Sequence, residues 1–516
     1  MEKFKKILSL ALALSMTAVL FTGCGGGNEA GTSEGGAEAK DTLTVAIQAD
    51  PRTVDPHAAS DSSSVNNLNP VYETLVRYDE NGNIAPLLAT EWKQLDELKY
   101  EFKLRDDVYF HNGEKMTAND VLFSFKRASG PEGMKVSYIM GAIDADNCEV
   151  VDDTTIIVAT KMPFPLIGYL PYIGAVVVSE KEFTENPEKA ASNPVGTGPF
   201  KFVSWAKNDK CVYERNDNYW GEKPKYKNLV IRTIAEANSR VIELESGTVD
   251  IALAIPAKSV ASLEDNPETK ILKKDSTSID YVVFNMKKKP LDDPKVRLAI
   301  DYAIDEKAIV DAVYLGTANY SPSTVVPSMM YFDDSDMDCR YDPEKAKALL
   351  KEAGVSDLHL QMIIAENKTR MDISVIMQQM LSEVGITMEI QSFESGTVSD
   401  MVDAGEHELT ISGWGAVGFP EPDNNIFGPF HTKFIPVDNK SFYSDPKMDE
   451  MLEEQRRLPD GPEREAKIKE IQKYLREVNP VLPIGNAQQI VGVRSNVEGF
   501  APTPAASHFY HSAYFA

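Results

Sequence analysis

Apolar residues at every second position predict strands near the start of the folded chain. Leu43, Val45 and Ile47 alternate in this way over residues 42–48, as in a strand with one buried face. Asn81-Gly82, a dipeptide typical of tight hairpins, separates two strand-like runs at residues 75–78 and 84–88. The other predictions of this kind are a polar loop over residues 61–67, a strand over 100–104, a strand over 108–113 that ends in a turn, and a strand over 279–285.

Start signals and apolar stripes at helical spacing predict several helices. Thr117-Ala118-Asn119-Asp120 has the spacing of a capping box ahead of a helix over residues 121–127. An acid followed by proline places an N-cap before the first helical residue at Asp293-Pro294, Asp342-Pro343 and Asp445-Pro446. The apolar stripes, which we assign to the core, are Val296, Ile300, Ala303 and Ile304, and Ile468, Ile471, Leu475 and Val478.

The first 40 residues are not expected to be part of the fold. A basic stretch precedes an apolar run, residues 7–21, that is too short to span a bilayer comfortably. Phe21-Thr22-Gly23-Cys24 resembles a bacterial lipobox, which makes Cys24 the expected lipidation site. We therefore predict a lipoprotein signal peptide over residues 1–24 and a flexible tether over 25–40, with a plain secretory signal as the alternative.

Composition and charge narrow the function classes. The chain has 516 residues, 42% of them apolar, and a net charge of −26. This length and apolar content suffice for packed cores in about three domains. An acidic chain without a basic cluster is not expected to bind nucleic acid. Besides Cys24 the cysteines are Cys148, Cys211 and Cys339, so at most one disulfide can form among these three, and the sequence leaves open whether any pair does.

The sequence offers no convincing catalytic or metal-binding motif. It has neither a Walker A loop nor an H-E-x-x-H motif. Ser444 and Lys447 have the S-x-x-K spacing of penicillin-type nucleophiles, but no S-D-N or K-T-G partner is present. His508 and His511 lack a nearby acid or cysteine, and we favour an aromatic-rich terminal strand there over a metal site. We expect a binding protein without a cofactor or metal, not an enzyme.

Residues 413–424 read Gly-Trp-Gly-Ala-Val-Gly-Phe-Pro-Glu-Pro-Asp-Asn, a mixture that suits the wall of a ligand pocket. Three of the glycines also spell the G-x-G-x-x-G of dinucleotide-binding proteins. That motif requires the glycines to open a helix, and Pro420 and Pro422 follow too closely for this. We predict a pocket turn after a strand, with an ordinary glycine-rich turn as the alternative.

The order of residues between Phe102 and Arg127 is distinctive. The pattern consists of Phe102, Leu104, Arg105, Val108, Phe110, His111, Gly113, Thr117, Ala118, Asp120, Val121, Ser124 and Arg127. Further matching stretches are residues 43–57, 193–200, 216–224 and 284–305. Together they resemble the family 5 extracellular solute-binding proteins, which are the peptide, nickel and opine receptors of ABC importers.

The resemblance implies an α/β fold of the periplasmic-binding-protein type. Its mixed sheets are flanked by helices and form two lobes with a hinge and an extra inserted domain. The implied domains are a discontinuous first domain over residues 41–78, 196–284 and 487–516, an inserted second domain over 79–195 and a third domain over 285–486. The chain would then cross between the lobes near Asn285 and Asn486, and closure of the lobes on ligand would give a state that a permease recognises.

The resemblance also implies where a ligand would bind. Peptide receptors of this family place an aspartate three residues before the acid of an acid-proline pair, where it holds the free amino group of the peptide. In this chain the pair is Glu421-Pro422, and Gly418 stands in the place of the aspartate. Either Glu421 or Asp423 could substitute for it. Trp414 could stack on a ligand or pack beneath the loop, and Tyr281 could line the cleft or belong to the core. The residues expected at the ligand are Trp414, Gly415, Ala416, Glu421, Asp423, Asn424 and Tyr281.

Three functions are compatible with these features. The first is a monomeric, lipid-anchored receptor outside the cytoplasm that delivers a small solute to ABC permease subunits. A peptide is the expected solute, although the missing acid at Gly418 weakens that case in favour of a sugar, an opine or a metal chelate. The second function is a sensor or chaperone on the same fold. The third, a secreted hydrolase, is disfavoured by the missing nucleophile motifs.

Overall fold

The computed structural model describes residues 40–79, 83–133, 136–415 and 420–516. The predicted signal peptide, the lipidation site Cys24 and all but the last residue of the tether lie outside the described residues. Asn81-Gly82, Ala416 and Gly418 also lie outside them. No described helix has both the length and the apolar character needed to cross a bilayer.

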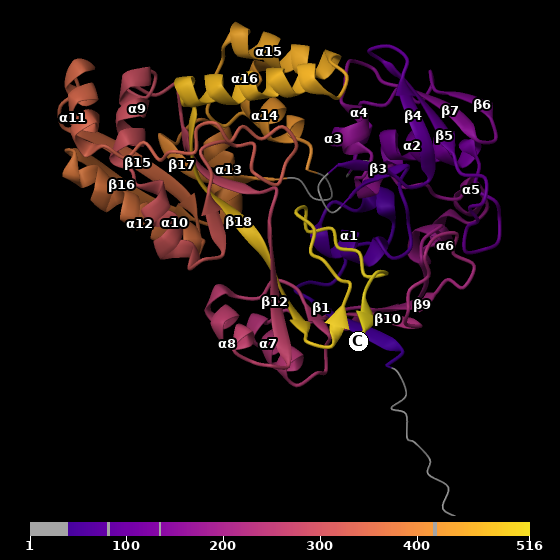
Figure 1. Cartoon of the computed structure of the whole chain (residues 1–516). Coiled ribbons are helices and arrows are strands. Elements are labelled where there is room, and N and C mark those ends of the chain that lie inside the picture. Colours follow the sequence, from indigo (N-terminus) through magenta and orange to yellow (C-terminus); the bar gives the residue numbers. More distant parts are fainter. Residues whose placement is uncertain (1–39, 80–82, 134–135, 416–419) are drawn as a thin grey trace, which may run out of the picture. The chain divides into compact units, whose positions relative to one another are not determined.

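A mixed sheet of twelve strands organises the described chain (Figure 1). Parallel and antiparallel pairs both occur in it, as the predicted fold class requires. Its order is β16 (Ile386–Phe393), β15 (Leu358–Ala365), β17 (Leu409–Trp414), β13 (Ile279–Phe284), β18 (Val481–Arg494), β11 (Ile251–Ala252), β1 (Thr42–Ile47), β10 (Asn228–Thr233), β9 (Lys210–Arg215) and β8 (Phe200–Ala206), with β12 (Thr269–Asp275) and β14 (Ala318–Tyr320) also paired to β18.

β18 belongs to both halves of this sheet. Its first part, Val481 to Gly485, pairs with β13, and its last part, Gln488 to Arg494, pairs with β12. Only residues 276–278 separate β12 from β13. The chain therefore passes between the two halves of the sheet twice, at residues 276–278 and in the middle of β18, and these two passages lie side by side. The Asn486 side chain donates hydrogen bonds of 2.7 Å to the backbone oxygens of Ser276 and Ser278, which ties this crossover together.

The predicted lobe crossings can be compared with this arrangement. Asn486 lies at the crossover within β18. Asn285 lies after the end of β13, where its side chain donates to the backbone oxygen of His407 at 2.8 Å. The change from β12 to β13 thus falls ahead of Asn285. The domain boundaries themselves stay a prediction.

Smaller sheets accompany the large one. β2 (Val76–Tyr78) pairs with β3 (Ile84–Pro86) in the antiparallel sense expected for a hairpin. A four-stranded antiparallel sheet has the order β4 (Ala89–Gln94), β5 (Lys99–Leu104), β7 (Thr155–Ala159) and β6 (Glu149–Asp152), and β19 (Val497–Glu498) pairs with β20 (Tyr514–Phe515). The strands predicted over residues 42–48, 100–104 and 279–285 are confirmed as β1, β5 and β13.

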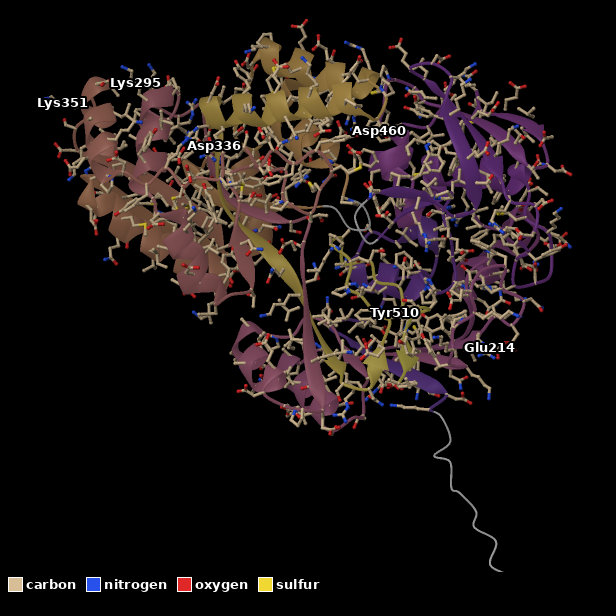
Figure 2. All side chains as sticks on the ribbon, viewed as in Figure 1. Glu214, Lys295, Asp336, Lys351, Asp460 and Tyr510 are labelled. Carbon is tan, nitrogen blue, oxygen red and sulfur yellow. The ribbon has the colours of Figure 1, made fainter. Side chains whose placement is uncertain are left out.

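Helices account for much of the remaining described chain. α9 and α11 pack together, with Lys295 on α9 and Lys351 on α11 (Figure 2). Lys295 pairs with Glu352 of α11 at 3.2 Å. The α-helices are α1 (Ser62–Leu68), α2 (Ala118–Ser129), α3 (Ser137–Met140), α4 (Leu166–Tyr169), α5 (Glu180–Glu185), α6 (Pro187–Ser192), α7 (Ala237–Glu245), α8 (Val260–Glu264), α9 (Pro294–Ala303), α10 (Glu306–Tyr314), α11 (Pro343–Glu352), α12 (Lys368–Glu383), α13 (Ser395–Asp403), α14 (Asp423–Phe430), α15 (Pro446–Arg457) and α16 (Pro462–Val478).

The predicted helix starts are confirmed. The Asp120 carboxylate of α2 accepts a hydrogen bond of 2.9 Å from the backbone N–H of Thr117, as a capping box requires. Asp293, Asp342 and Asp445 accept backbone hydrogen bonds as the N-caps of α9, α11 and α15. All but one of the predicted stripe residues are buried, and Val478 is partly buried.

The prediction of a polar loop over residues 61–67 is wrong, because these residues form α1. Asp61 caps this helix by accepting from the backbone N–H of Ser64 at 3.0 Å. The Asn66 side chain explains a second error near the C-terminus. It accepts a hydrogen bond of 2.9 Å from the backbone N–H of His508, so this backbone pairs with a side chain and residues 508–511 do not form the predicted strand.

The prediction of a strand over residues 108–113 is also wrong. A single bridge joins Tyr109 to Lys115, and the backbone N–H of Phe110 donates to the oxygen of Glu114 at 2.8 Å. The segment folds into a local turn because these bonds connect it to itself.

Cys148, Cys211 and Cys339 are free thiols, so none of the disulfides left open by the sequence is present. Over the described residues no cluster of histidine, cysteine, aspartate or glutamate is arranged to hold a metal ion.

Candidate functional site

Among the described residues of the stretch 413–424, no helix begins at Gly413 or Gly415. β17 ends at Trp414, and α14 begins only at Asp423, with Pro422 as its N-cap. A proline can occupy this position because no intrahelical donor is required there. The described part of this stretch therefore agrees with a turn between a strand and a helix, and its geometry gives no support to a dinucleotide site.

A pocket of about 270 Å³ lies where β17 ends and where the chain passes from β12 to β13. Gly413 and Gly415 allow the close approach of strands here, since a Cβ added to Gly415 would lie 2.3 Å from the Ser278 Oγ. The described residues that line the pocket are Ser278, Ile279, Asp280, Gly413, Trp414, Gly415, Gly485 and Ala487.

Trp414 is held in the wall of this pocket. Its indole Nε1–H donates a hydrogen bond of 2.8 Å to the backbone oxygen of Asn424. The ring is half-buried and packs against the core around Ile279 and Tyr281, so it both contributes to the core and borders the pocket. Of the described residues predicted at the ligand, Trp414 and Gly415 line the pocket, and Asn424 supports Trp414 through its backbone.

Tyr281 lies in the core. It is 3% exposed and packs with Ile279 and Val283 on one face of β13. Burial raises the pKa of its hydroxyl well above the ordinary value. Because side chains alternate along a strand, Asp280 projects from the opposite face. The core role considered for Tyr281 is therefore the one seen in the structure.

Glu421 is fully buried in an ion pair with Arg464. An Arg464 Nη2–H donates to its Oε1 at 2.5 Å, and the backbone N–H of Asp423 donates to the same oxygen at 3.0 Å. Burial raises the pKa of Glu421, and Arg464 offsets part of that rise. Arg464 of α16 also pairs with Asp460, so one buried guanidinium joins two carboxylates.

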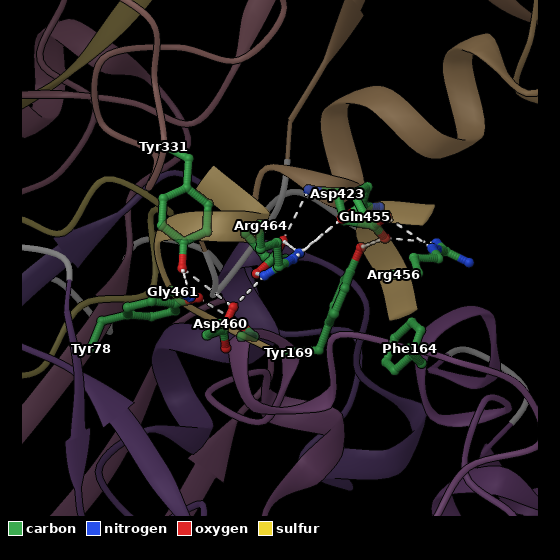
Figure 3. A network of polar contacts seen from close by, with 12 residues as sticks. Tyr78, Phe164, Tyr169, Tyr331, Asp423, Gln455, Arg456, Asp460, Gly461 and Arg464 are labelled. Atoms are coloured by element: carbon green, nitrogen blue, oxygen red, sulfur yellow. Dashed lines mark hydrogen bonds and ion pairs between the residues drawn. The ribbon is translucent and has the colours of Figure 1, made fainter. Parts of the chain in front are cut away.

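Asp423 has an equally complete set of partners (Figure 3). Arg456 of α15 donates to both carboxylate oxygens, at 2.8 and 2.6 Å, and the Tyr169 hydroxyl of α4 donates at 2.9 Å. Although burial alone would raise the pKa of Asp423, Arg456 brings it below the ordinary value. The contact with Tyr169 connects α14 to α4, a helix distant in the sequence.

Close packing leaves little space at Glu421. A Cβ added to Gly168 of α4 would lie 2.1 Å from the Glu421 Oε2. The Gly168 backbone oxygen accepts from the Tyr78 hydroxyl at 2.7 Å, which fixes this approach. Both carboxylates considered as partners of a ligand ammonium are thus 0% exposed and have arginine partners. Their contact with a ligand stays a prediction.

The sequence analysis did not select Asp280. Its neighbours in the strand, Ile279 and Tyr281 to Phe284, are apolar or aromatic and buried, and an acid inside such a run is unusual enough to serve as a signal. Asp280 is the single charged side chain among the described residues that line the pocket.

Comparison with known proteins connects this geometry to one family. A family model described as bacterial extracellular solute-binding proteins, family 5, middle, matches residues 83–434. Heme-binding protein A of Haemophilus influenzae is 27% identical over 538 aligned residues, which cover 97% of this chain and 97% of that protein. Di/tripeptide-binding protein 2 of Pseudomonas aeruginosa is 29% identical over 505 residues, with 90% and 93% covered.

A solved structure supports the fold. The ABC transporter-associated periplasmic binding protein DppA from Helicobacter pylori, in complex with the peptide STSA, is 29% identical to this chain. The alignment covers 92% of this chain and 98% of the other, with a TM-score of 0.73. The predicted α/β fold of the periplasmic-binding-protein type is thereby confirmed.

Proposed function

This chain belongs to the family 5 bacterial extracellular solute-binding proteins, and from this premise we propose that it is a receptor for a peptide. The family consists of solute-binding proteins and not of enzymes, in agreement with the missing catalytic motifs. We further propose that the protein works as a monomer, anchored to the membrane through a lipid on Cys24, and delivers its ligand to an ABC importer.

The observation that carries the proposal is the pocket between Trp414 and the crossover of β12, β13 and β18. Its lining brings together an indole ring, three glycines that expose backbone and one carboxylate. Aromatic and backbone groups of this kind bind small ligands with polar ends. The relatives named for dipeptides and tripeptides, and the neighbour solved with a tetrapeptide, favour a peptide over other solutes.

The crossover supplies a mechanism for signalling. Two strands connect the halves of the large sheet at residues 276–278 and at Asn486, and small backbone rotations there would move one half against the other. A ligand that contacts both halves would stabilise the closed arrangement over the open one. A ligand shifts the protein towards the closed arrangement only if it binds that arrangement more tightly than the open one, however tight its binding is overall.

Calorimetry with a panel of dipeptides, tripeptides and tetrapeptides, including Ser-Thr-Ser-Ala, tests the proposal. We expect saturable binding of at least one peptide, accompanied by a change in tryptophan fluorescence, with the peptide recovered intact by mass spectrometry. Hydrolysis of the peptide, or the absence of binding across the panel, would show that the proposal is wrong.

Hemin is included as a second probe because one relative is named a heme-binding protein. The described residues that line the pocket include no histidine, cysteine, methionine or tyrosine, which are the usual ligands of heme iron. We therefore expect hemin not to compete with the peptide. Competition would shift the proposed solute from a peptide to a tetrapyrrole.

The lipid anchor has an independent test. In a bacterial host that processes lipoproteins, the protein should fractionate with membranes, and a Cys24→Ser variant should appear in the soluble fraction. Membrane association of the variant would contradict lipidation at Cys24 without affecting the proposed ligand.

A further inference from the structure

Asp280 lies in the wall of the pocket, on the face of β13 that also carries Val282 and Phe284. Its neighbours in the pocket are uncharged: Trp414, the glycines and the hydroxyl of Ser278. A cationic group that enters the pocket would therefore meet one negative charge.

The Asp280 carboxylate has an incomplete set of partners. The Tyr314 hydroxyl of α10 donates to Oδ2 at 2.7 Å. Oδ1 accepts no hydrogen bond from any described residue, and it lies 2.8 Å from the position of a Cβ added to Gly413, another pocket residue. Half of the acceptor capacity of this carboxylate is thus available at the pocket wall.

One cation lies near Asp280 without pairing with it. The Arg370 Nη2 of α12 lies 3.9 Å from the position of a Cβ added to Gly413, which the Asp280 Oδ1 also approaches, yet Arg370 makes no ion pair with Asp280 within 4.0 Å. Burial raises the pKa of Asp280, and neither Tyr314 nor Arg370 fully offsets this rise. A carboxylate in this condition is stabilised when a further N–H donor with positive charge reaches it.

The pocket has room for part of a ligand. Pockets for whole drug-sized ligands measure roughly 300–1,000 Å³, and this one, at about 270 Å³, has space for one end or one side chain of a ligand. A primary ammonium group fits these requirements, because it is compact and carries three donors. A carboxylate end would be repelled by Asp280, and a neutral amide would leave the negative charge of Asp280 unmatched.

We propose that Asp280 is the subsite for a primary ammonium group of the peptide ligand, in place of the acid missing at Gly418. This inference rests on the proposed function. The ammonium group is either the amino terminus of the peptide or the side chain of a lysine, and both present the same chemistry to Asp280.

The test is a cycle of protein and peptide variants, measured by calorimetry with the tightest-binding peptide of the panel. The protein variant is Asp280→Asn, which keeps an acceptor for the Tyr314 hydroxyl but removes the charge. The peptide variants are the Nα-acetylated form and, where lysine is present, the form with norleucine in its place. We expect Asp280→Asn to weaken binding of the unmodified peptide more than tenfold.

One of the modified peptides should then bind the parent protein more than tenfold more weakly than the unmodified peptide does. That modified peptide should bind the parent protein and Asp280→Asn with equal affinity. Whether acetylation or norleucine has this effect identifies the ammonium group. Asp275→Asn is the matched control, because Asp275 lies on β12, outside the pocket, and accepts from the side chains of Asn319 and Gln488. We expect this control to bind the peptide as the parent protein does.

Each contrary outcome is distinguishable. If the peptide binds the parent and Asp280→Asn equally well, the subsite is wrong and the peptide receptor stands. If Asp280→Asn weakens the unmodified and both modified peptides by the same factor, the effect of Asp280 is structural and the subsite is again wrong. If no peptide in the panel binds the parent protein, the proposed function and the subsite are overturned together.

Discussion

Two groups of carboxylates near β17 differ in the partners that the fold gives them. Glu421 and Asp423 are fully buried, and each has an arginine and at least one further donor. Asp280 is only partly buried, and its partner is the neutral hydroxyl of Tyr314. The two groups therefore differ in the charge left for a ligand.

This difference in partners separates acids that stabilise the fold from an acid that remains available to a ligand. A buried carboxylate paired with a bidentate guanidinium is costly to disturb, because removal of either partner leaves the other as a buried charge with neither a partner nor water around it. A carboxylate with one neutral donor retains both unused acceptor capacity and unmatched charge. By this criterion Glu421 and Asp423 connect the start of α14 to α4, α15 and α16, whereas Asp280 lines the pocket.

The largest expected effect is on the arginine-paired group. Arg464→Met leaves Glu421 buried without its cation, and we expect it to lower the free energy of unfolding by about 3–5 kcal/mol. Denaturant unfolding monitored by circular dichroism measures this loss. Arg457→Met is the control, since Arg457 is 50% exposed and pairs with Glu453 on the surface of the same helix bundle. A loss at Arg464 no larger than that at Arg457 would contradict the structural role of the cluster.

An intermediate effect is expected at Glu73, a third buried acid that has only neutral donors. The side chains of Thr197, Tyr219 and Trp220 donate to it at 2.8, 2.7 and 3.0 Å, and burial raises its pKa to about 7. The folded state therefore binds a proton that the unfolded state releases near pH 4.5. The stability contributed by the protonated acid is present at low pH and is lost as the pH rises through 7.

The measurement at Glu73 compares the parent protein with Glu73→Gln at pH 5 and pH 8. The free-energy difference between the two proteins should shrink by up to about 3 kcal/mol at the higher pH, because a shift of one pKa unit corresponds to about 1.4 kcal/mol. Titration of other groups affects both proteins and cancels. A difference that does not change with pH would show that neutral donors are enough to keep a buried acid ionised.

The smallest effect is expected at Asp280. Because the charged form of Asp280 is disfavoured in the folded state, Asp280→Asn should change the free energy of unfolding at pH 8 by less than about 1 kcal/mol, towards higher stability. Asp423→Asn, which disturbs the pair with Arg456, should destabilise the protein by several times as much. If thermal unfolding showed similar losses of stability for the two variants, Asp280 and the arginine-paired Asp423 would not differ in their structural role.

Local signals were sufficient for much of the fold. Asp293, Asp342 and Asp445 cap helices where an acid and proline stand together, and alternation located β1 and β13. Two of the three errors involve residues that meet only in the fold, whereas residues 108–113 form a local turn through their own backbone bonds. Residues 61–67 and 508–511 are polar or aromatic stretches whose structure depends on contacts with each other through Asn66, and a contact between residues so far apart in the chain leaves no trace in local periodicity.

The site was harder to predict for a related reason. Trp414 and Gly415 could be selected because indole and glycine are unusual side by side at the end of a strand. The acids of residues 421–423 resembled ligand-binding groups in the sequence, but their arginine partners come from α15 and α16 and cannot be inferred from spacing. Asp280 was passed over because its pocket forms only when β13, β17 and β18 come together.

The position of β18 late in the chain has a consequence for synthesis. β11, β12, β13 and β14 all pair with it, so the sheet lacks its shared central strand until Val481 and the residues after it have been made. Multidomain proteins commonly complete their N-terminal domain while the rest is still being translated. Here neither half of the sheet is complete until β18 has been made, although pairs such as β1–β10 and β15–β16 do not depend on it.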